Sequence, residues 1–456
     1  MGGLGLALLL PPLFSGLTPA GQRALLVTLI TIVLWTTRWL DAGATALLGV
    51  TLLALTGASR SFREALQGFA NPVPYFLVAV LALGVAVAKS GLAERAARHI
   101  LDRARGRPLA MYVQLVLAMP ALTFILPSAT SRTGILVHIY EEVFGQARVP
   151  RGADVAKPVM LALSSINRLA STALLTGGIT PVMAAAIIGG MSWTGWLALL
   201  AVPYYALLAL GAILTWGLHR RGFAAALARA EDRPPTPLSS AEWRTGAVVA
   251  GTGLLWLTDA WHHLDPTLPA MLGLVALLAP RFGTLAWADL DRHVGWGNFF
   301  VIGASISLAH ALGESGAAAW LARGLVGGLP GMGRHPLASV TLLMLGATVL
   351  RAAIPNISGF LALGLPIAMS VGREVGLNPL VCALVVMMTG DAVLYYPVQS
   401  GSALVIYERG HVTAGEMLRF GLWMTAAAYA AILLVALPYW GLLGEALTMT
   451  ATASGR

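Results

Sequence analysis

Apolar stretches of about 20 residues follow one another along most of the chain, separated by short polar segments. That length is what a helix needs to cross the hydrocarbon core of a bilayer. A first span is expected at 4–17. We expect this span to be irregular, because Pro11 and Pro12 interrupt the helix. The uninterrupted stretches, which we predict to be membrane-crossing helices, are 23–40, 42–55, 73–89, 194–216, 245–261, 268–279, 296–312 and 420–443.

Two further apolar segments, at about 108–145 and 336–371, are each interrupted in the middle. The first interruption reads PSATSR at 127–132, and the second reads IPNISG at 354–359. At membrane depth, backbone that leaves the helix is tolerated only where it is buried in protein or lines a cavity. We therefore predict two re-entrant hairpins whose tips hold a small solute.

The apolar segments that follow the hairpins are interrupted as well. Segment 158–188 contains TGGITP at 176–181, and segment 379–407 contains PVQSGS at 397–402. We predict that both are discontinuous spans. Together with the uninterrupted stretches they give an all-α polytopic membrane protein with about 11 transmembrane helices plus the two hairpins.

Matching landmarks indicate an internal repeat. Ser90-Gly91 and Ser315-Gly316 each end an apolar span of similar make-up, 225 residues apart. The first hairpin tip, near residue 130, and Asn356 in the second tip are 226 residues apart. Two landmarks at nearly one offset predict two homologous halves. The expected organisation is an N-terminal repeat at 1–218, a cytoplasmic linker at 219–244 and a C-terminal repeat at 245–456.

The positive charges predict the orientation in the membrane. Arginines gather in 92–107, which has the periodicity of an amphipathic surface helix, in 146–157 and in the linker. Basic segments next to spans mark the cytoplasmic side, so we expect the N-terminus and the opening of the first hairpin there. The number of predicted spans gives the second half the opposite membrane orientation to the first. The second hairpin is therefore expected to open to the outside.

Composition agrees with this class of protein. Of the 456 residues, 57% are hydrophobic and 11% are charged, whereas about a quarter of a soluble protein is charged. The net charge of +9 resides mainly in short loops, so we expect the lipid bilayer, and no nucleic acid, as a partner. The single cysteine, Cys382, excludes an intramolecular disulfide and a cysteine-based metal site.

The interrupted segments resemble those of a known family, the divalent-anion:sodium symporters, which include citrate, dicarboxylate and sulfate permeases. Ser128-Ala129-Thr130 looks like the family's first Ser-Asn-Thr tip, with alanine in place of asparagine. Pro355-Asn356-Ile357, followed by Ser358, looks like the second tip. TGGITP and PVQSGS look like the family's Thr-Pro-Pro-like helix breaks, and YERGHVTAGEMLRFGL is similar to its last loop and span.

The resemblance implies a secondary active transporter, not an enzyme, in the cytoplasmic membrane. It implies movement of a small anion, either a di- or tricarboxylate or sulfate, by alternating access with sodium coupling, and it implies a homodimer. No cofactor is expected besides sodium as the coupling ion. The alternative is a proton-coupled or exchange-type anion permease, which the divergent tips and Asp391 favour. A passive channel is a weaker alternative, because two inverted repeats favour alternating access.

An intramembrane serine protease is a distant alternative, since Gly313-Glu314-Ser315-Gly316 matches its short motif. The repeat partner of this motif, Ala88-Lys89-Ser90-Gly91, lacks the first glycine. Both sequences are better explained as helix ends, where glycine stops the helix.

Oxygen ligands are abundant at the four interruptions. Sodium prefers several oxygen ligands, and residues at a break release carbonyl groups from the helix. The helix that starts after each tip favours an anion at its N-terminus. The expected substrate contacts are Ser128, Ala129, Thr130, Arg132, Thr180, Asn356, Ile357, Ser358 and Ser400. We expect Ser128, Thr130, Thr176 and Thr180 to line one sodium site, and Asn356, Ser358, Ser400 and Ser402 to line the other. The competing interpretation is that these small residues serve close helix packing.

Four of the charged residues within the predicted membrane segments lie at or near the interruptions, where charge is costly and usually functional or paired. Arg132 is expected either to contact the anion or to pair internally, and Arg351 to extend towards the outer surface. Arg168 and Asp391 lie in corresponding discontinuous spans. They predict a salt bridge between the repeats, or a role of Asp391 in proton coupling.

Overall fold

The computed structural model describes residues 14–104, 106–224, 237–329 and 331–448. Within these ranges the chain is helical, with one isolated bridge between Leu377 and Thr448 as its only extended pairing. The predicted all-α class is therefore confirmed. The expected span at 4–17 and much of the expected linker lie outside the described residues.

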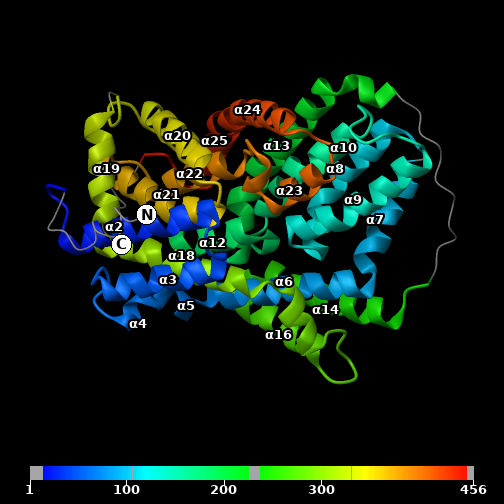
Figure 1. Ribbon diagram of the computed structural model, residues 1–456, viewed down its shortest axis with the longest axis horizontal. Coiled ribbons are helices and arrows are strands. Elements are labelled where there is room, and N and C mark those ends of the chain that lie inside the picture. Colours follow the sequence, from blue (N-terminus) through cyan, green and yellow to red (C-terminus); the bar gives the residue numbers. More distant parts are fainter. Residues whose placement is uncertain (1–13, 105, 225–236, 330, 449–456) are drawn as a thin grey trace.

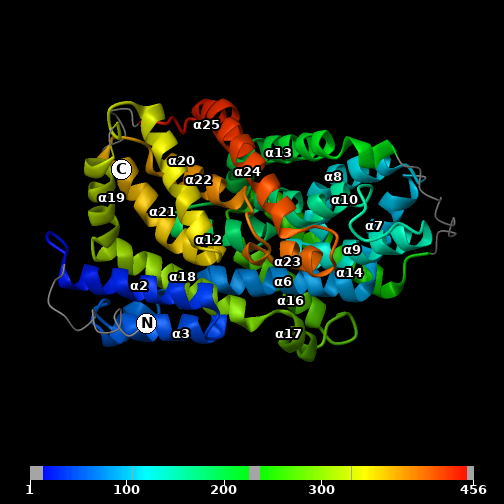
Figure 2. The same cartoon turned by 45° about the horizontal axis from the view of Figure 1, so that its top comes forward.

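Long helices of both halves form one layer along one side of the molecule (Figures 1 and 2). Helix α18 packs on α3, α5 and α6, and α16 packs on α6 and α14. Gly68 on α5 permits a very close approach to α18, because a Cβ there would lie 2.0 Å from the Gly303 carbonyl oxygen. The layer consists of α2 (Pro19–Thr37), α3 (Ala42–Leu55), α4 (Phe62–Ala65), α5 (Gln67–Ala70), α6 (Pro72–Ser90), α14 (Ser240–Leu257), α15 (Asp259–His262), α16 (Thr267–Leu278), α17 (Trp287–His293) and α18 (Trp296–Glu314).

Two shorter helices run across the direction of α6 and α18 at opposite ends of the molecule: α7 (Leu92–Asp102) and α19 (Ala317–Gly328) (Figure 1). Gly91 and Gly316 make the two corners with φ of 86° and 77°, a region that glycine adopts at little cost. Arg95 of α7 lies 2.5 Å from Glu242 at the start of α14. The hydrogen bonds that Arg95 donates to this carboxylate raise the pKa of Arg95.

Two helix pairs occupy the positions of the predicted hairpins. The first is α8 (Pro108–Ile125) with α9 (Ala129–Gln146), and the second is α20 (Pro336–Ala353) with α21 (Ile357–Glu374). Every one of these helices has 18 residues. Ser128 and Asn356 cap α9 and α21 with side-chain oxygens, so each break lies where the sequence placed it. Entry of both arms from one membrane side stays a prediction.

Each hairpin is followed by a segment that the structure breaks into pieces. The first comprises α10 (Lys157–Leu161), the π-helix η1 (Ala162–Ile166), α11 (Asn167–Thr172), η2 (Leu175–Gly177) and α12 (Ile179–Ile188). The second comprises α22 (Pro379–Asp391), η4 (Pro397–Gln399) and α23 (Gly401–Glu408). The remaining helices are α13 (Trp193–Leu218), η3 (Arg220–Ala224), α24 (Ala414–Ala431), η5 (Ile432–Ala436) and α25 (Leu437–Leu442).

Six of the described helices are long and apolar enough to cross a membrane, and seven if the bent pair α17–α18 counts as one span. The six are α2, α6, α8, α13, α20 and the continuous run from α24 to α25. Length and composition alone therefore support a multi-pass protein. The count of 11 stays a prediction, because it also includes short and broken helices that only their neighbours can hold in a bilayer.

Candidate functional site

The two halves contact each other through the hairpins and the discontinuous segments. Helix α9 of the first hairpin packs on α23, which belongs to the second half. Helix α21 of the second hairpin packs on α12, which belongs to the first half. Both contacts are visible as neighbouring ribbons in Figures 1 and 2. The first hairpin thus contacts the second discontinuous segment, and the second hairpin contacts the first.

Arg132 ties the first hairpin tip to the first discontinuous segment. The side chain is fully buried in the first turn of α9. Its guanidinium donates to the Leu126 carbonyl at the break, to Ser171 Oγ, and to the side-chain and backbone oxygens of Asn167 at 2.9 and 3.1 Å. Asn167 returns a bond of 3.0 Å to the Ala129 carbonyl. These contacts turn the guanidinium of Arg132 towards protein oxygens.

Arg351 links the second hairpin tip to the second discontinuous segment. Its guanidinium donates to the carbonyls of Ile354 and Pro355 at 2.8 and 2.7 Å, and across to Gly390 and Gln399 at 3.0 and 3.3 Å. The side chain is fully buried. The expectation that Arg351 extends towards the outer surface is therefore wrong, because the freed carbonyls of two breaks draw the guanidinium inward.

A buried ion pair joins the two discontinuous segments. Arg168 of α11 donates to the Asp391 carboxylate at 3.2 Å and to the Asp391 backbone oxygen at 2.6 Å. Thr172 and Thr180 donate to the same carboxylate at 2.7 and 3.1 Å. The predicted salt bridge between the halves is therefore present. Since Asp391 accepts from Thr180 in the first turn of α12, an internal anion lies at the start of that helix.

The other pair of helix starts, α9 with α23, has a different character. A Cβ at Gly401, the first residue of α23, would lie 2.7 Å from Thr130 Oγ1. Thr130, Ser131 and Gly401 are exposed, and the Thr130 hydroxyl forms no hydrogen bond within the described part of the chain. Two helix N-termini thus meet at an accessible place with a free hydroxyl.

Further predicted residues take part in fixing this geometry. Ser400 Oγ lies 2.8 Å from Ser402 Oγ, and Ser402 donates to the Ser164 carbonyl in η1 at 2.9 Å. Asn356 Oδ1 accepts from the backbone N–H groups of Ser358 and Gly359 at 2.8 and 3.3 Å. Ser358 and Thr176 are buried, whereas Ile357 and Ala129 are half-buried.

The structure groups the predicted residues differently from the sequence. Thr130 lies beside Gly401 of the other half, and Thr180 donates to Asp391, which also belongs to the other half. Each predicted sodium site draws its hydroxyls from one half, whereas these contacts bring residues of the two halves together. Two amide side chains that hold the breaks in place, Asn167 and Gln399, were not predicted to be site residues. Their only signal was a position inside an interruption of the apolar pattern.

The donor set fits a hard monovalent cation only in part. Among the described residues, no group of three or more His, Cys, Asp or Glu side chains could hold a metal ion. Hydroxyl oxygens remain for sodium at Ser128, Thr130 and Ser400. However, the break carbonyls of Leu126, Ile354 and Pro355 accept from guanidinium groups. These arginines place fixed positive charge at oxygens that a break would otherwise offer to a cation.

Comparison with known proteins gives a consistent family. The family described as "Sodium:sulfate symporter transmembrane region" matches residues 4–446. The Arabidopsis thaliana chloroplastic dicarboxylate transporter 1 is 24% identical over 91% of this chain and 77% of its own length. The L-tartrate/succinate antiporter of Escherichia coli K12 is 22% identical over 84% of this chain and 81% of its own length.

A solved structure agrees at the level of the fold. The YdaH transporter of Alcanivorax borkumensis superposes with a TM-score of 0.53 and 17% identity, covering 84% of this chain and 88% of that one. The resemblance inferred from the tips and helix breaks is confirmed by the family match, and the protein is a transporter and not an enzyme. The chain is a multi-pass membrane protein that belongs to the sodium:sulfate symporter family, the divalent-anion:sodium symporters.

Proposed function

We propose that this transporter carries a small dicarboxylate by alternating access, and that the carboxylate binds between the N-termini of α9 and α23. The single observation that carries this assignment is the contrast between the two pairs of helix starts. At α12 the Asp391 carboxylate is already in place, whereas α9 and α23 meet at exposed residues that no carboxylate of the described residues contacts by a hydrogen bond.

Local chemistry supports an anion there. The first turn of each helix leaves backbone N–H groups without helical partners and carries a partial positive charge. Ser128 uses its Oγ to cap the Ser131 N–H at 3.2 Å, which holds the turn in shape. Thr130 and Ser400 add hydroxyl donors on the two sides. A dicarboxylate suits the site, because related proteins are named as dicarboxylate and tartrate/succinate carriers.

The coupling ion is the finer part of the proposal. Sodium coupling is supported by the family description and by hydroxyl oxygens at Ser128, Thr130, Ser400 and Ser402. Exchange of one anion for another is the second candidate. The specific observation in its favour is that Arg132 and Arg351 already donate to the break carbonyls.

Uptake of radiolabelled succinate into proteoliposomes tests the proposal. Sodium coupling predicts uptake that follows an inward sodium gradient. Exchange predicts uptake that requires succinate inside the vesicle and ignores sodium. Thr130→Asp should abolish uptake in either case, because a carboxylate at the α9 N-terminus repels the substrate while it stabilises the helix.

A matched control isolates the site. Ser240→Asp adds the same charge to the first turn of α14, at an exposed position outside the site, and should leave uptake unchanged. Full uptake by Thr130→Asp protein, with the control equally active, would remove the α9–α23 site from the proposal. No uptake of succinate, malate or sulfate by the wild-type protein would contradict the function itself.

A further inference from the structure

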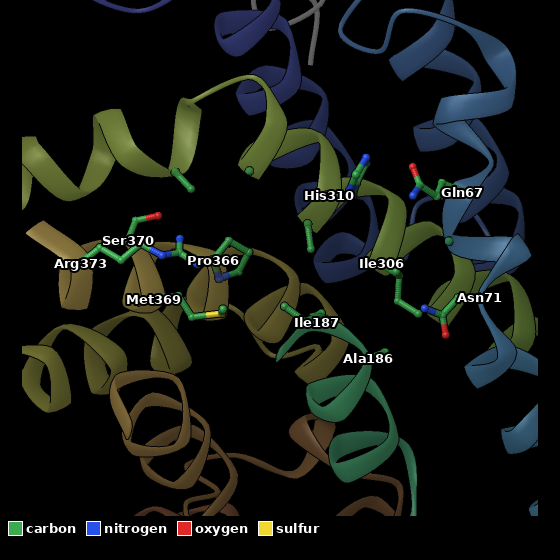
Figure 3. Close-up of a pocket in the computed structure, with 14 residues that line it drawn as sticks. Gln67, Asn71, Ala186, Ile187, Ile306, His310, Pro366, Met369, Ser370 and Arg373 are labelled. Atoms are coloured by element: carbon green, nitrogen blue, oxygen red, sulfur yellow. The ribbon is translucent and has the colours of Figure 1, made fainter. Parts of the chain in front are cut away.

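A cavity of about 280 Å³ lies towards the α19 end of the molecule, away from the hairpin tips (Figure 3). One wall comes from the layer of long helices, with Gln67 at α5 and Ile306 and His310 on α18. The opposite wall comes from α21, with Met369 and Arg373, and from α12. The cavity is close to the lower end of the volumes of small-molecule sites, roughly 300–1,000 Å³.

Unpaired polar side chains converge on this cavity. Within the described ranges, the side chains of Arg373, His310, Gln67 and Ser370 form no hydrogen bond or ion pair. Figure 3 shows Arg373 reaching along α21 towards Pro366, with His310 across from it. The side-chain oxygen Oδ1 of Asn71 accepts a hydrogen bond of 3.0 Å from the Val73 N–H. Its amide NH2 group forms no hydrogen bond among the described residues.

The lining favours an anion with an apolar body. None of the described residues that line the cavity is acidic, and Arg373 brings a permanent positive charge. The imidazole of His310 can donate a hydrogen bond in either protonation state. Ile187, Ile306, Pro366 and Met369 supply apolar surface between the polar groups. A guanidinium next to apolar walls suits a carboxylate carried on an aromatic or aliphatic group.

This cavity is separate from the proposed dicarboxylate site, which lies between the N-termini of α9 and α23. None of the described residues that line the cavity belongs to α9 or α23. The cavity is also distant from the second hairpin tip, because the rise of α21 from Ile357 to Arg373 is about 24 Å at about 1.5 Å per residue.

We propose that the cavity is a second, inhibitory site for amphiphilic monocarboxylates, with Arg373 as the anchor of the carboxylate. A bound molecule contacts α5 and α18 on one side and α12 and α21 on the other. It thereby links the layer of long helices to the helices that carry the breaks. The inhibitory effect rests on the proposed transport function, whereas binding does not.

Binding of benzoate to the purified full-length protein, measured by isothermal titration calorimetry, tests the site. Wild-type protein should bind benzoate at least tenfold more tightly than benzamide, its neutral isostere. Arg373→Gln should weaken benzoate binding at least tenfold, and Arg373→Lys should retain part of it. Arg323→Gln removes an exposed arginine of α19 outside the cavity and should bind benzoate as the wild type does.

Transport supplies the second readout. Benzoate should lower the Vmax of succinate uptake without changing its KM, and Arg373→Gln should keep uptake while it loses the inhibition. Equal benzoate affinity in wild type and Arg373→Gln would overturn the proposal, as would competitive displacement of benzoate by succinate or no benzoate binding at all. Absence of succinate uptake with intact, Arg373-dependent benzoate binding would contradict the transport function and leave the site standing.

Discussion

The start of α12 and the pair of helix starts α9–α23 both lie at breaks of the helical segments, yet they differ in charge. At α12, Asp391 accepts from Thr172, Thr180 and Arg168. At α9 and α23, Thr130 and Gly401 are exposed and Thr130 keeps a free hydroxyl. Two of the breaks thus provide helix starts that favour an anion, and Asp391 occupies the first of them. The proposed substrate site is the place where helix starts lie without a carboxylate of the described residues.

Removing Asp391 should have the largest effect. Asp391→Ala leaves Arg168 buried without its carboxylate, and breaking one side of a buried pair costs about 3–5 kcal/mol of unfolding free energy. The thermal unfolding of the detergent-purified protein should shift down accordingly. The double variant Arg168→Met/Asp391→Leu should recover most of the loss. A double variant as unstable as the single one would show that the charges are required for more than each other.

Arg351→Ala should come next. Four carbonyls lose their donor, and we expect a loss of about 2–4 kcal/mol, because Pro355 at least is reachable by water. Arg351→Lys should recover little of this, since an ammonium cannot reach carbonyls of two breaks at once. Thermal unfolding measures both. An Arg351→Lys variant as stable as the wild type would contradict the explanation that the planar guanidinium, with its several N–H donors, is needed to reach these carbonyls.

Adding a methyl group at Gly401 should affect transport more than stability. Gly401→Ala places a Cβ 2.7 Å from Thr130 Oγ1, and we expect the resulting shift of the two helix starts to weaken succinate binding by about 1–2 kcal/mol. The KM for succinate should rise about five- to thirtyfold. Thr130→Ala in the same chain should relieve the effect. Gly415→Ala is the matched control, because a Cβ there meets nothing within 4 Å.

The smallest effects should come from replacing Thr130 and Thr180. These two variants should distinguish the helix starts of α9 and α23 from the start of α12, which Asp391 occupies. Thr130→Val should raise the KM for succinate about two- to tenfold with unchanged thermal unfolding, since one hydrogen bond is worth about 0.5–1.5 kcal/mol. Thr180→Val should instead lower stability by about 1 kcal/mol, because Asp391 keeps Thr172 and Arg168 as donors. The same KM change in both variants would contradict the distinction between an open and an occupied pair.

The fold class and the positions of the interruptions could be predicted from the amino-acid pattern alone. Spans near bilayer length, two interrupted segments and matching landmarks are local properties, so they survive without tertiary information. The breaks at Leu126–Ser128 and Ile354–Asn356 fall inside or directly beside the predicted interruptions. The family could also be inferred, because the tip and break motifs are short and contiguous.

The contacts between the two hairpins and the two discontinuous segments could not be predicted from the sequence. Helices α9 and α21 each pack on a helix of the other half, and no spacing in the chain encodes that exchange. The same is true of Arg351, which was expected to extend towards the outer surface but whose guanidinium donates to carbonyls 39 and 48 residues away. Buried donors and acceptors must be satisfied by whatever lies nearest in space, and proximity in space is set by packing and not by sequence distance.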